Sequence, residues 1–429
     1  GEYTFAYNET SLPAYNSRQT DIWGYYNGIS YADLLGGFGS GLTARRIAVK
    51  EKMAAEILTC VTYPTGGRTE YTYEPHRYSK KALPFDFSPV ACESEGEAGG
   101  LRIKTITDYS IDGEVPQVRT FEYSENGVSS GILSAEGECK IEGSQSFINN
   151  VLNFTGSYVL YNEMPILPLS DTDGNHVTYS FVREIFPDGS YVDHRFSNFD
   201  ASECQDYAPA KEIGRVTGCP LYPKFTSRSL FRGLLTERTT YRAGGNPVLQ
   251  ETFTYGNIGN PDRFKSVSRH SYFGERVVFA AYISAHCGYP GMLTKKEVRY
   301  LDDGSNLKEI YTYTYNEQRL LESSQCSRVS ATYDEENPSV PYDSETNGER
   351  YYYPKDRSGE PYARMLDEKM HGVLVGKAVL RKGKVTGGTE TVYVEREISG
   401  GDPERSSLIV PHKQFSSELT FPESISGYS

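Results

Sequence analysis

Five segments of the chain repeat one plan, and this repetition limits the possible fold more than any other feature. Each segment opens with an apolar pair and runs through β-favouring residues to a polar tip that contains glycine. Each then returns through aromatic residues that alternate with Thr or Glu. The segments span residues 56–74, 100–123, 233–255, 291–315 and 372–395. Because successive side chains of a strand point to opposite faces, each segment is expected to form an antiparallel β-hairpin.

The return strand of residues 291–315 shows the alternation most clearly. Tyr311, Tyr313 and Tyr315 are expected to share one face of a sheet, with the intervening threonines on the other. A tip such as "PTGG" (64–67) could cradle a phosphate if it stood alone. Its four counterparts favour a hairpin turn, which needs glycine for positive φ angles. Two further hairpins are expected over residues 177–196 and 266–284.

Composition agrees with a mainly β fold, because the chain holds 35 Tyr but only 5 Met and 1 Trp. We expect an array of antiparallel β-hairpins, a twisted sheet, with about two short helices. One helix is expected over about residues 43–57, with Thr43 as a possible N-cap. The second is expected over residues 361–372, where Pro361 stands near the start and Gly372 near the end.

The 429 residues are long enough for two parts. We expect an N-terminal β region with the first helix over residues 1–160 and a hairpin-repeat region over residues 161–429. The uneven spacing of the five segments also leaves one continuous array open.

The net charge of −13 disfavours binding to nucleic acid or to an anionic membrane surface, since both require a basic surface. The longest apolar runs are too short for a transmembrane helix, so this segment is not expected to insert into a membrane. A strand-like stretch follows directly after Gly1, and we expect that a secretion signal has been removed.

Motifs of known chemistry are missing from the sequence. The glycine-rich stretch "LLGGFGSGLTARR" (34–46) lacks the ending of a P-loop, and the seven His show no zinc-binding spacing. We therefore expect no catalytic residues, no metal and no cofactor, and a protein that is not an enzyme. A glycosidase-type hydrolase is a less favoured alternative, because it needs only two carboxylates close in space.

The stretch "TDIWGYYNG" (20–28) contains the candidate binding residues. Aromatic rings beside a carboxylate and an amide can stack on sugar rings and bond their hydroxyls. The candidates are Asp21, Trp23, Tyr25, Tyr26 and Asn27. The alternative is a buried aromatic anchor that holds the N-terminus against the sheet, with Asn27 and Gly28 forming a turn.

One stretch, "RYLDDGSNLKEIYTYTYNEQRLLESS" (299–324), resembles a YD repeat of the RHS family. The matching positions are Tyr313, Tyr315, Asn316, Arg319 and Leu320. Asn316 stands where the family usually has Asp, and Gln318 where it usually has Gly. The stretches "DIWGYYNG", "YPTGGRTEYTYE" and "GGLRI" resemble N-terminal parts of large RHS/YD-like surface proteins of Bacteroidetes-type bacteria. The C-terminal core region of such proteins is not visible.

This resemblance implies an exported β-hairpin scaffold in the periplasm or on the outer-membrane surface, with an unknown protein or glycan as its partner. The expected function is that of a non-enzymatic scaffold or interaction protein of the bacterial cell envelope. A carbohydrate-binding envelope module that uses Trp23, Tyr25 and Tyr26 is the main alternative.

Overall fold

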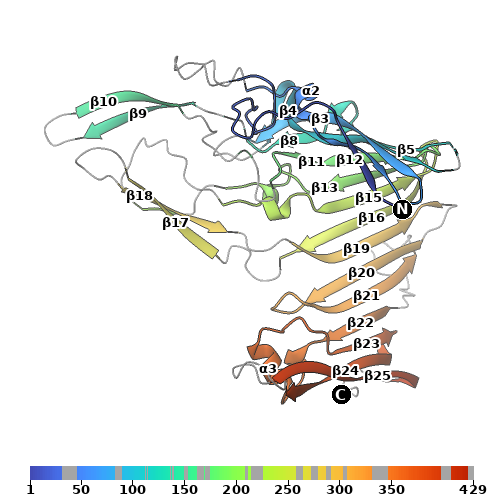
Figure 1. The fold of residues 1–429 in the computed structure, drawn as a ribbon. Coiled ribbons are helices and arrows are strands. Elements are labelled where there is room, and N and C mark those ends of the chain that lie inside the picture. Colours follow the sequence, from blue (N-terminus) through green and yellow to red (C-terminus); the bar gives the residue numbers. More distant parts are fainter. Residues whose placement is uncertain are drawn as a thin grey trace. The chain divides into compact units, whose positions relative to one another are not determined.

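The computed structural model of the chain is mainly β and antiparallel, as the sequence predicts (Figure 1). It describes residues 1–30, 46–82, 89–111, 113, 115–135, 137, 140–148, 153–161, 169, 174–207, 211–213, 226–257, 264–271, 279–286, 291–302, 307–330, 346–397 and 407–423. In these ranges the α-helices are α2 (Lys50–Met53) and α3 (Tyr362–Asp367). None of the helices described is long and apolar enough to span a membrane.

The chain divides into two compact units. Unit 1 comprises Gly1–Asn246 and Pro261–Pro290, and unit 2 comprises Pro247–Asn260 and Gly291–Ser429. Whether the chain also folds as the two parts expected from the sequence, residues 1–160 and 161–429, stays a prediction, because compactness does not test independent folding.

Unit 1 is built around a run of antiparallel strands in which each strand pairs with the next. In spatial order they are β1 (Thr4–Tyr7), β2 (Leu58–Thr62), β3 (Arg68–Ala82), β4 (Pro89–Tyr109), β5 (Gln117–Glu122), β12 (Phe181–Ile185), β13 (Tyr191–Phe196) and β15 (Leu235–Tyr241). Strand β8 (Gly131–Leu133) pairs in parallel with the end of β3 and antiparallel with β11 (Val177–Tyr179).

Smaller groups of strands and short 3₁₀-helices complete unit 1. Strand β6 (Ser124–Glu125) pairs with β7 (Val128–Ser129), and β9 (Lys140–Ile148) pairs with β10 (Asn153–Tyr161). Strand β18 (Phe279–His286) lies between β14 (Lys211–Ile213) and β17 (Phe264–Ser271). The 3₁₀-helices are η2 (Ser202–Cys204) and η3 (Ser229–Phe231).

Unit 2 is an antiparallel meander whose described strands pair in chain order. They are β16 (Pro247–Gly256), β19 (Met292–Tyr300), β20 (Leu307–Tyr315), β21 (Leu321–Ser330), β22 (Asn347–Tyr352), β23 (Gly376–Arg381), β24 (Lys384–Glu397) and β25 (Ser407–Glu423). The 3₁₀-helix η5 (Pro354–Asp356) precedes α3, and Met365 of α3 is buried with Tyr362 and Val375 in a small apolar cluster.

The predicted hairpins are confirmed where both strands lie in one unit. The pairs are β2 with β3, β4 with β5, β19 with β20, β23 with β24, β12 with β13 and β17 with β18. The segment 233–255 supplies β15 and β16, which fall in different units.

Four turns between described strands share one five-residue geometry. The backbone N–H of the first residue donates to the carbonyl of the fifth, and the N–H of the fourth donates to the carbonyl of the first. The fourth residue has a positive φ, which is typical of a type I turn followed by a left-handed residue. The turns are Tyr63–Gly67, Phe186–Ser190, Arg242–Asn246 and Asn316–Leu320. The tip at residues 63–67 is therefore a hairpin turn rather than a phosphate loop.

In several pairs of neighbouring strands, a tyrosine on or just after the second strand bonds to the first. Its hydroxyl donates to the backbone carbonyl of an apolar residue on a strand earlier in the chain. The distances are 2.7 Å from Tyr73 to Leu58 and 2.8 Å from Tyr123 to Ile103, Tyr315 to Leu293 and Tyr353 to Leu321. The pairing register shifts directly before both Tyr73 and Tyr315, so the bond coincides with a bulge that bends the strand.

The first predicted helix is much shorter than expected. Residues 43–45 lie outside the described ranges, residues 46–49 are not helical, and α2 covers only four residues. The carbonyl of Arg46 accepts from the N–H of Ile22, and that of Ile47 accepts from the Asn27 side chain, so this stretch bonds to the N-terminal loop instead. Val49 is extended, and Glu56 with its φ of 52° ends the turn after α2. The second predicted helix is confirmed as α3, with an earlier end at Asp367.

Replacement of Tyr315 by Phe tests the contribution of the tyrosine bond. The change removes one hydroxyl and leaves the Leu293 carbonyl without its donor, so we expect a loss of about 1 kcal/mol in the free energy of unfolding. Urea denaturation measures this loss. Tyr313→Phe is the matched control, since Tyr313 lies on the same strand face. An equal effect of both variants would contradict a specific role for the bond.

Candidate functional site

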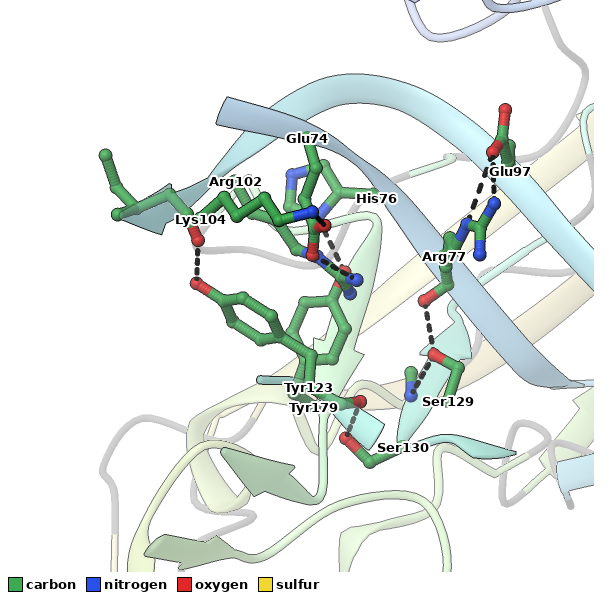
Figure 2. A network of polar contacts seen from close by, with 12 residues as sticks. Glu74, His76, Arg77, Glu97, Arg102, Lys104, Tyr123, Ser129, Ser130 and Tyr179 are labelled. Carbon is green, nitrogen blue, oxygen red and sulfur yellow. Dashed lines mark hydrogen bonds and ion pairs between the residues drawn. The ribbon is translucent and has the colours of Figure 1, made fainter. Parts of the chain in front are cut away.

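A polar network of charged and aromatic groups lies on β3 and β4 of unit 1 (Figure 2). Glu74 and His76 are two residues apart on β3, so their side chains share a face. The register pairs Glu74 with Arg102 of β4, and Lys104 follows Arg102 by two residues. The register of the two strands, which shifts between Thr72 and Tyr73 and again between Pro75 and His76, brings these four side chains together.

Arg102 is the centre of this network. Its side chain is only 10% exposed, and its Nε and Nη2 atoms lie 2.9 Å and 2.7 Å from Glu74 Oε1. The guanidinium carbon lies 4.1 Å from the ring centre of Tyr123 and 5.0 Å from that of Tyr179. Burial raises the pKa of Tyr123 to about 12, so its hydroxyl stays protonated and donates to the Ile103 carbonyl. Arg102 is therefore ion-paired with Glu74 and also stacked on two tyrosine rings.

Two histidines continue the network beside Arg102. The ring centres of His76 and His176 are 5.3 Å apart, and Nδ1 of His76 lies 2.8 Å from the Tyr179 hydroxyl. Nε2 of His176 lies 2.6 Å from the Gly99 carbonyl, which can only accept, so this nitrogen carries the proton. Burial, followed by the charges of His176 and Arg102, lowers the pKa of His76 to about 4. At neutral pH His76 is therefore uncharged.

The predicted stretch around Asp21 adopts the turn geometry of the hairpins. The N–H of Asp21 donates to the Tyr25 carbonyl, and the N–H of Gly24, with a φ of 96°, donates to the Asp21 carbonyl. Asp21 Oδ1 also accepts from the N–H groups of Trp23 and Tyr25 at 2.9 Å and 2.8 Å. In the turn of the YD-like repeat, Asn316 Oδ1 accepts at the same two positions. In both turns a residue with a positive φ angle follows the Asp or Asn by three positions, in the sequences D-x-x-G and N-x-x-R.

The five predicted binding residues lie in one loop but differ in exposure. Asp21 and Asn27 are buried, Trp23 and Tyr26 are half-buried, and Tyr25 is 40% exposed. The Trp23 ring packs against the apolar cluster of β4, β8 and β11, and the rings of Trp23 and Tyr25 lie 5.9 Å and 5.8 Å from that of His176. This packing fits the anchor alternative, and a carbohydrate-binding role stays a prediction.

Sequence reasoning missed the residues against which this loop packs. His76, Arg102 and His176 come from segments far apart in the chain, and no motif links them. Gly99 is the one local clue, because a Cβ atom there would come within 2.2 Å of Asp21 Oδ2. In the part of the chain that the structure describes, no group of three or more His, Cys, Asp or Glu could hold a metal ion.

A separate hollow of about 200 Å³ lies in unit 2 and contains two carboxylates. It is lined by Thr314, Glu322, Ser323, Gln325, Glu349, Arg350 and Leu380. Hydrogen bonds from Tyr351 and Lys377 lower the pKa of Glu349, so this carboxylate is ionised and already bonded. That state suits a cross-strand ion pair better than a general acid, whose pKa should be raised.

Comparisons with known proteins find distant likenesses to solved structures. No family model matches the sequence, and no curated protein matches it. The chain is similar to part of the crystal structure of TcdB2-TccC3, with 7% identity and a TM-score of 0.36, over 80% of this chain and 17% of that one. It is also similar to a porin-like protein from Bacteroides uniformis, with 11% identity and a TM-score of 0.20, over 71% of this chain and 90% of that one.

Arg102 and Arg77 offer a matched test of the network, because both are paired arginines on β3 or β4. Replacement of Arg102 by Gln leaves the Glu74 carboxylate, 23% exposed, without its main partner. We expect a loss of about 2–3 kcal/mol in the free energy of unfolding. The pair of Arg77 with Glu97 has side chains 53% and 50% exposed, so Arg77→Gln should cost less than about 0.5 kcal/mol.

Urea denaturation at neutral pH and again in high salt measures both variants. Salt should weaken the small effect of Arg77→Gln further and leave the effect of Arg102→Gln largely in place, because a buried pair is screened less. Equal losses for the two variants would show that burial of Arg102 has no special role in the network.

Proposed function

We propose that the chain is a non-enzymatic β-hairpin scaffold or interaction protein of the bacterial cell envelope. The observation that carries this proposal is the repetition of one hairpin design, with the same five-residue turn and the same tyrosine-to-carbonyl bond. Such repetition adds strands to a sheet without building a catalytic cleft. The turn at Asn316, which carries the resemblance to YD repeats, is one of these repeated turns.

The pairing of the charged groups supports the same proposal. Several buried or half-buried carboxylates bond to a cation on a neighbouring strand. Examples with distances of 2.7–2.9 Å are Glu74 with Arg102, Glu251 with Lys296, Glu297 with Lys308, Glu309 with Arg328 and Glu349 with Lys377. Cross-strand pairs of opposite charge stabilise a sheet and fix its register. We therefore assign these charged side chains a role in stabilising the sheet.

The envelope location rests on the resemblance to exported RHS/YD-like surface proteins. It is tested by fractionating the bacterium that carries the natural gene and by treating intact cells with a protease. We expect the protein in the envelope or periplasmic fraction, with export dependent on a removable leader encoded by the gene. Recovery of the protein only with cytoplasmic markers would overturn the proposed location.

The carbohydrate-binding alternative keeps one supporting observation, the 40% exposure of Tyr25 beside Trp23. Trp23 is the single tryptophan, so its fluorescence reports binding directly. For a scaffold without a sugar site, we expect no change in emission with a panel of cell-surface glycans. Saturable quenching that is lost in Tyr25→Ala would favour the alternative. Tyr63→Ala, at a 37% exposed tyrosine of a hairpin turn, is the control.

A further inference from the structure

The hollow of about 200 Å³ in unit 2 lies on the strands β20 to β23, and polar side chains of one sheet face line it. The register pairs Thr314 with Ser323 and Ser323 with Arg350, so these three side chains form a row on that face. Gln325 follows Ser323 by two residues and therefore shares the face. Its partner in the register is Gly348, which adds no side chain beside Arg350.

Glu322 joins this set because β21 is irregular at that position. Thr314 pairs with Ser323, and Tyr315 pairs with Leu321, so Glu322 is an extra residue on the strand. An extra residue of this kind changes the direction of nearby side chains. Glu322 and its neighbour Ser323 therefore both line the hollow, although adjacent residues of a regular strand point to opposite faces.

Arg350 is the cation of the hollow, and it lies against a tyrosine ring. Its guanidinium carbon is 5.8 Å from the ring centre of Tyr352, which shares its sheet face. Arg357 lies 5.3 Å from the same ring and is ion-paired with Glu390 at 3.0 Å. Arg350 is half-buried as well, but among the described residues it has no ion pair and no side-chain hydrogen bond. Its N–H groups are therefore free to bind an anionic group of a ligand.

Glu322 is the matching anion. It is half-buried, and in the described part of the chain its carboxylate has neither an ion pair nor a hydrogen bond. Glu349, the other carboxylate residue of the hollow, is already bonded to Lys377 at 2.9 Å. The hollow thus holds one cation and one anion, Arg350 and Glu322, which lie too far apart to pair with each other.

We propose that this hollow binds a small zwitterion of the amino-acid type, with its carboxylate on Arg350 and its ammonium group on Glu322. The planar fork of an arginine matches the two oxygens of a carboxylate. A carboxylate in turn accepts the N–H bonds of an ammonium group. The hydroxyls of Thr314 and Ser323, 2.7 Å apart, and the amide of Gln325 offer donors and acceptors to a polar side chain of the ligand.

Other classes of ligand fit the hollow less well. A phosphate would meet the negative charge of Glu322, and a neutral sugar would leave Arg350 without an anion. A simple carboxylate would leave Glu322 without a cation. A volume of about 200 Å³ is below that of sites for drug-sized molecules, so it suits a single amino acid. The site lies wholly in unit 2 and does not depend on the proposed scaffold function.

Binding of free amino acids to the full chain tests the proposal without any variant. The probes are L-serine, L-asparagine and L-glutamine, titrated in saturation-transfer NMR. We expect saturable binding of at least one of them. The N-acetyl derivative of that amino acid lacks the ammonium group, and its methyl ester lacks the carboxylate. Each derivative should bind at least about tenfold more weakly, since each loses a charged hydrogen-bond partner.

Two outcomes of this titration would overturn the proposal. One is the absence of saturable binding by all three amino acids. The other is equal binding of the N-acetyl derivative and the parent amino acid, because the hollow would then recognise a carboxylate alone.

Variants assign the binding to the hollow. Arg350→Gln and Glu322→Gln should each weaken binding at least about tenfold. Arg381→Gln and Glu317→Gln are the matched controls, because both residues are exposed charges in the neighbouring strand or turn and neither lines the hollow. Far-UV circular dichroism confirms that each variant is folded. Unchanged affinity in Arg350→Gln, or an equal loss in the controls, would overturn the assignment.

Discussion

Four of the described strand pairs are held by the same kind of hydrogen bond, from a tyrosine hydroxyl to a backbone carbonyl on the preceding strand. Among the residues that the structure describes, the buried apolar clusters are small, and each contains three residues with less than a tenth of their surface exposed. Sheets with so little buried apolar volume need another source of order. The tyrosine ring supplies apolar contact area and its hydroxyl supplies a directional bond, so one side chain serves both packing and register.

Tyr73, Tyr123, Tyr315 and Tyr353 make this bond, which a phenylalanine could not form. Where the pairing register shifts at Tyr73 and Tyr315, a bulge places the hydroxyl against the carbonyl of the strand that opens the hairpin. A phenylalanine would leave this carbonyl without its donor. The bulge and the hydrogen bond thus occur together, and the same combination recurs in different hairpins.

The sequence predicts the hairpins well because alternation and glycine-containing tips are local signals. It predicts the helix at residues 43–57 badly, since the carbonyls of Arg46 and Ile47 bond to the N-terminal loop, about 20 residues earlier in the chain, which a local pattern does not reveal. The network at Arg102 was not predicted for a related reason. Alternation shows which residues share a face, whereas the pairing of Glu74 with Arg102 also depends on the bulges of β3 and β4. Those bulges shift the register without a clear signal in the sequence.

A comparison of the turns at Asn316 and Asp21 shows which side-chain atoms the turn itself requires. Asn316 and Asp21 accept the same pair of backbone bonds, so an amide oxygen is sufficient for the turn. In both, the second polar atom, Nδ2 of Asn316 and Oδ2 of Asp21, has no partner among the residues described. The cost of an unbonded amide does not vary with pH, while that of an unbonded carboxyl group changes with its ionisation. The turn does not require the acid at position 21, whose carboxylate instead lies against Gly99 of β4.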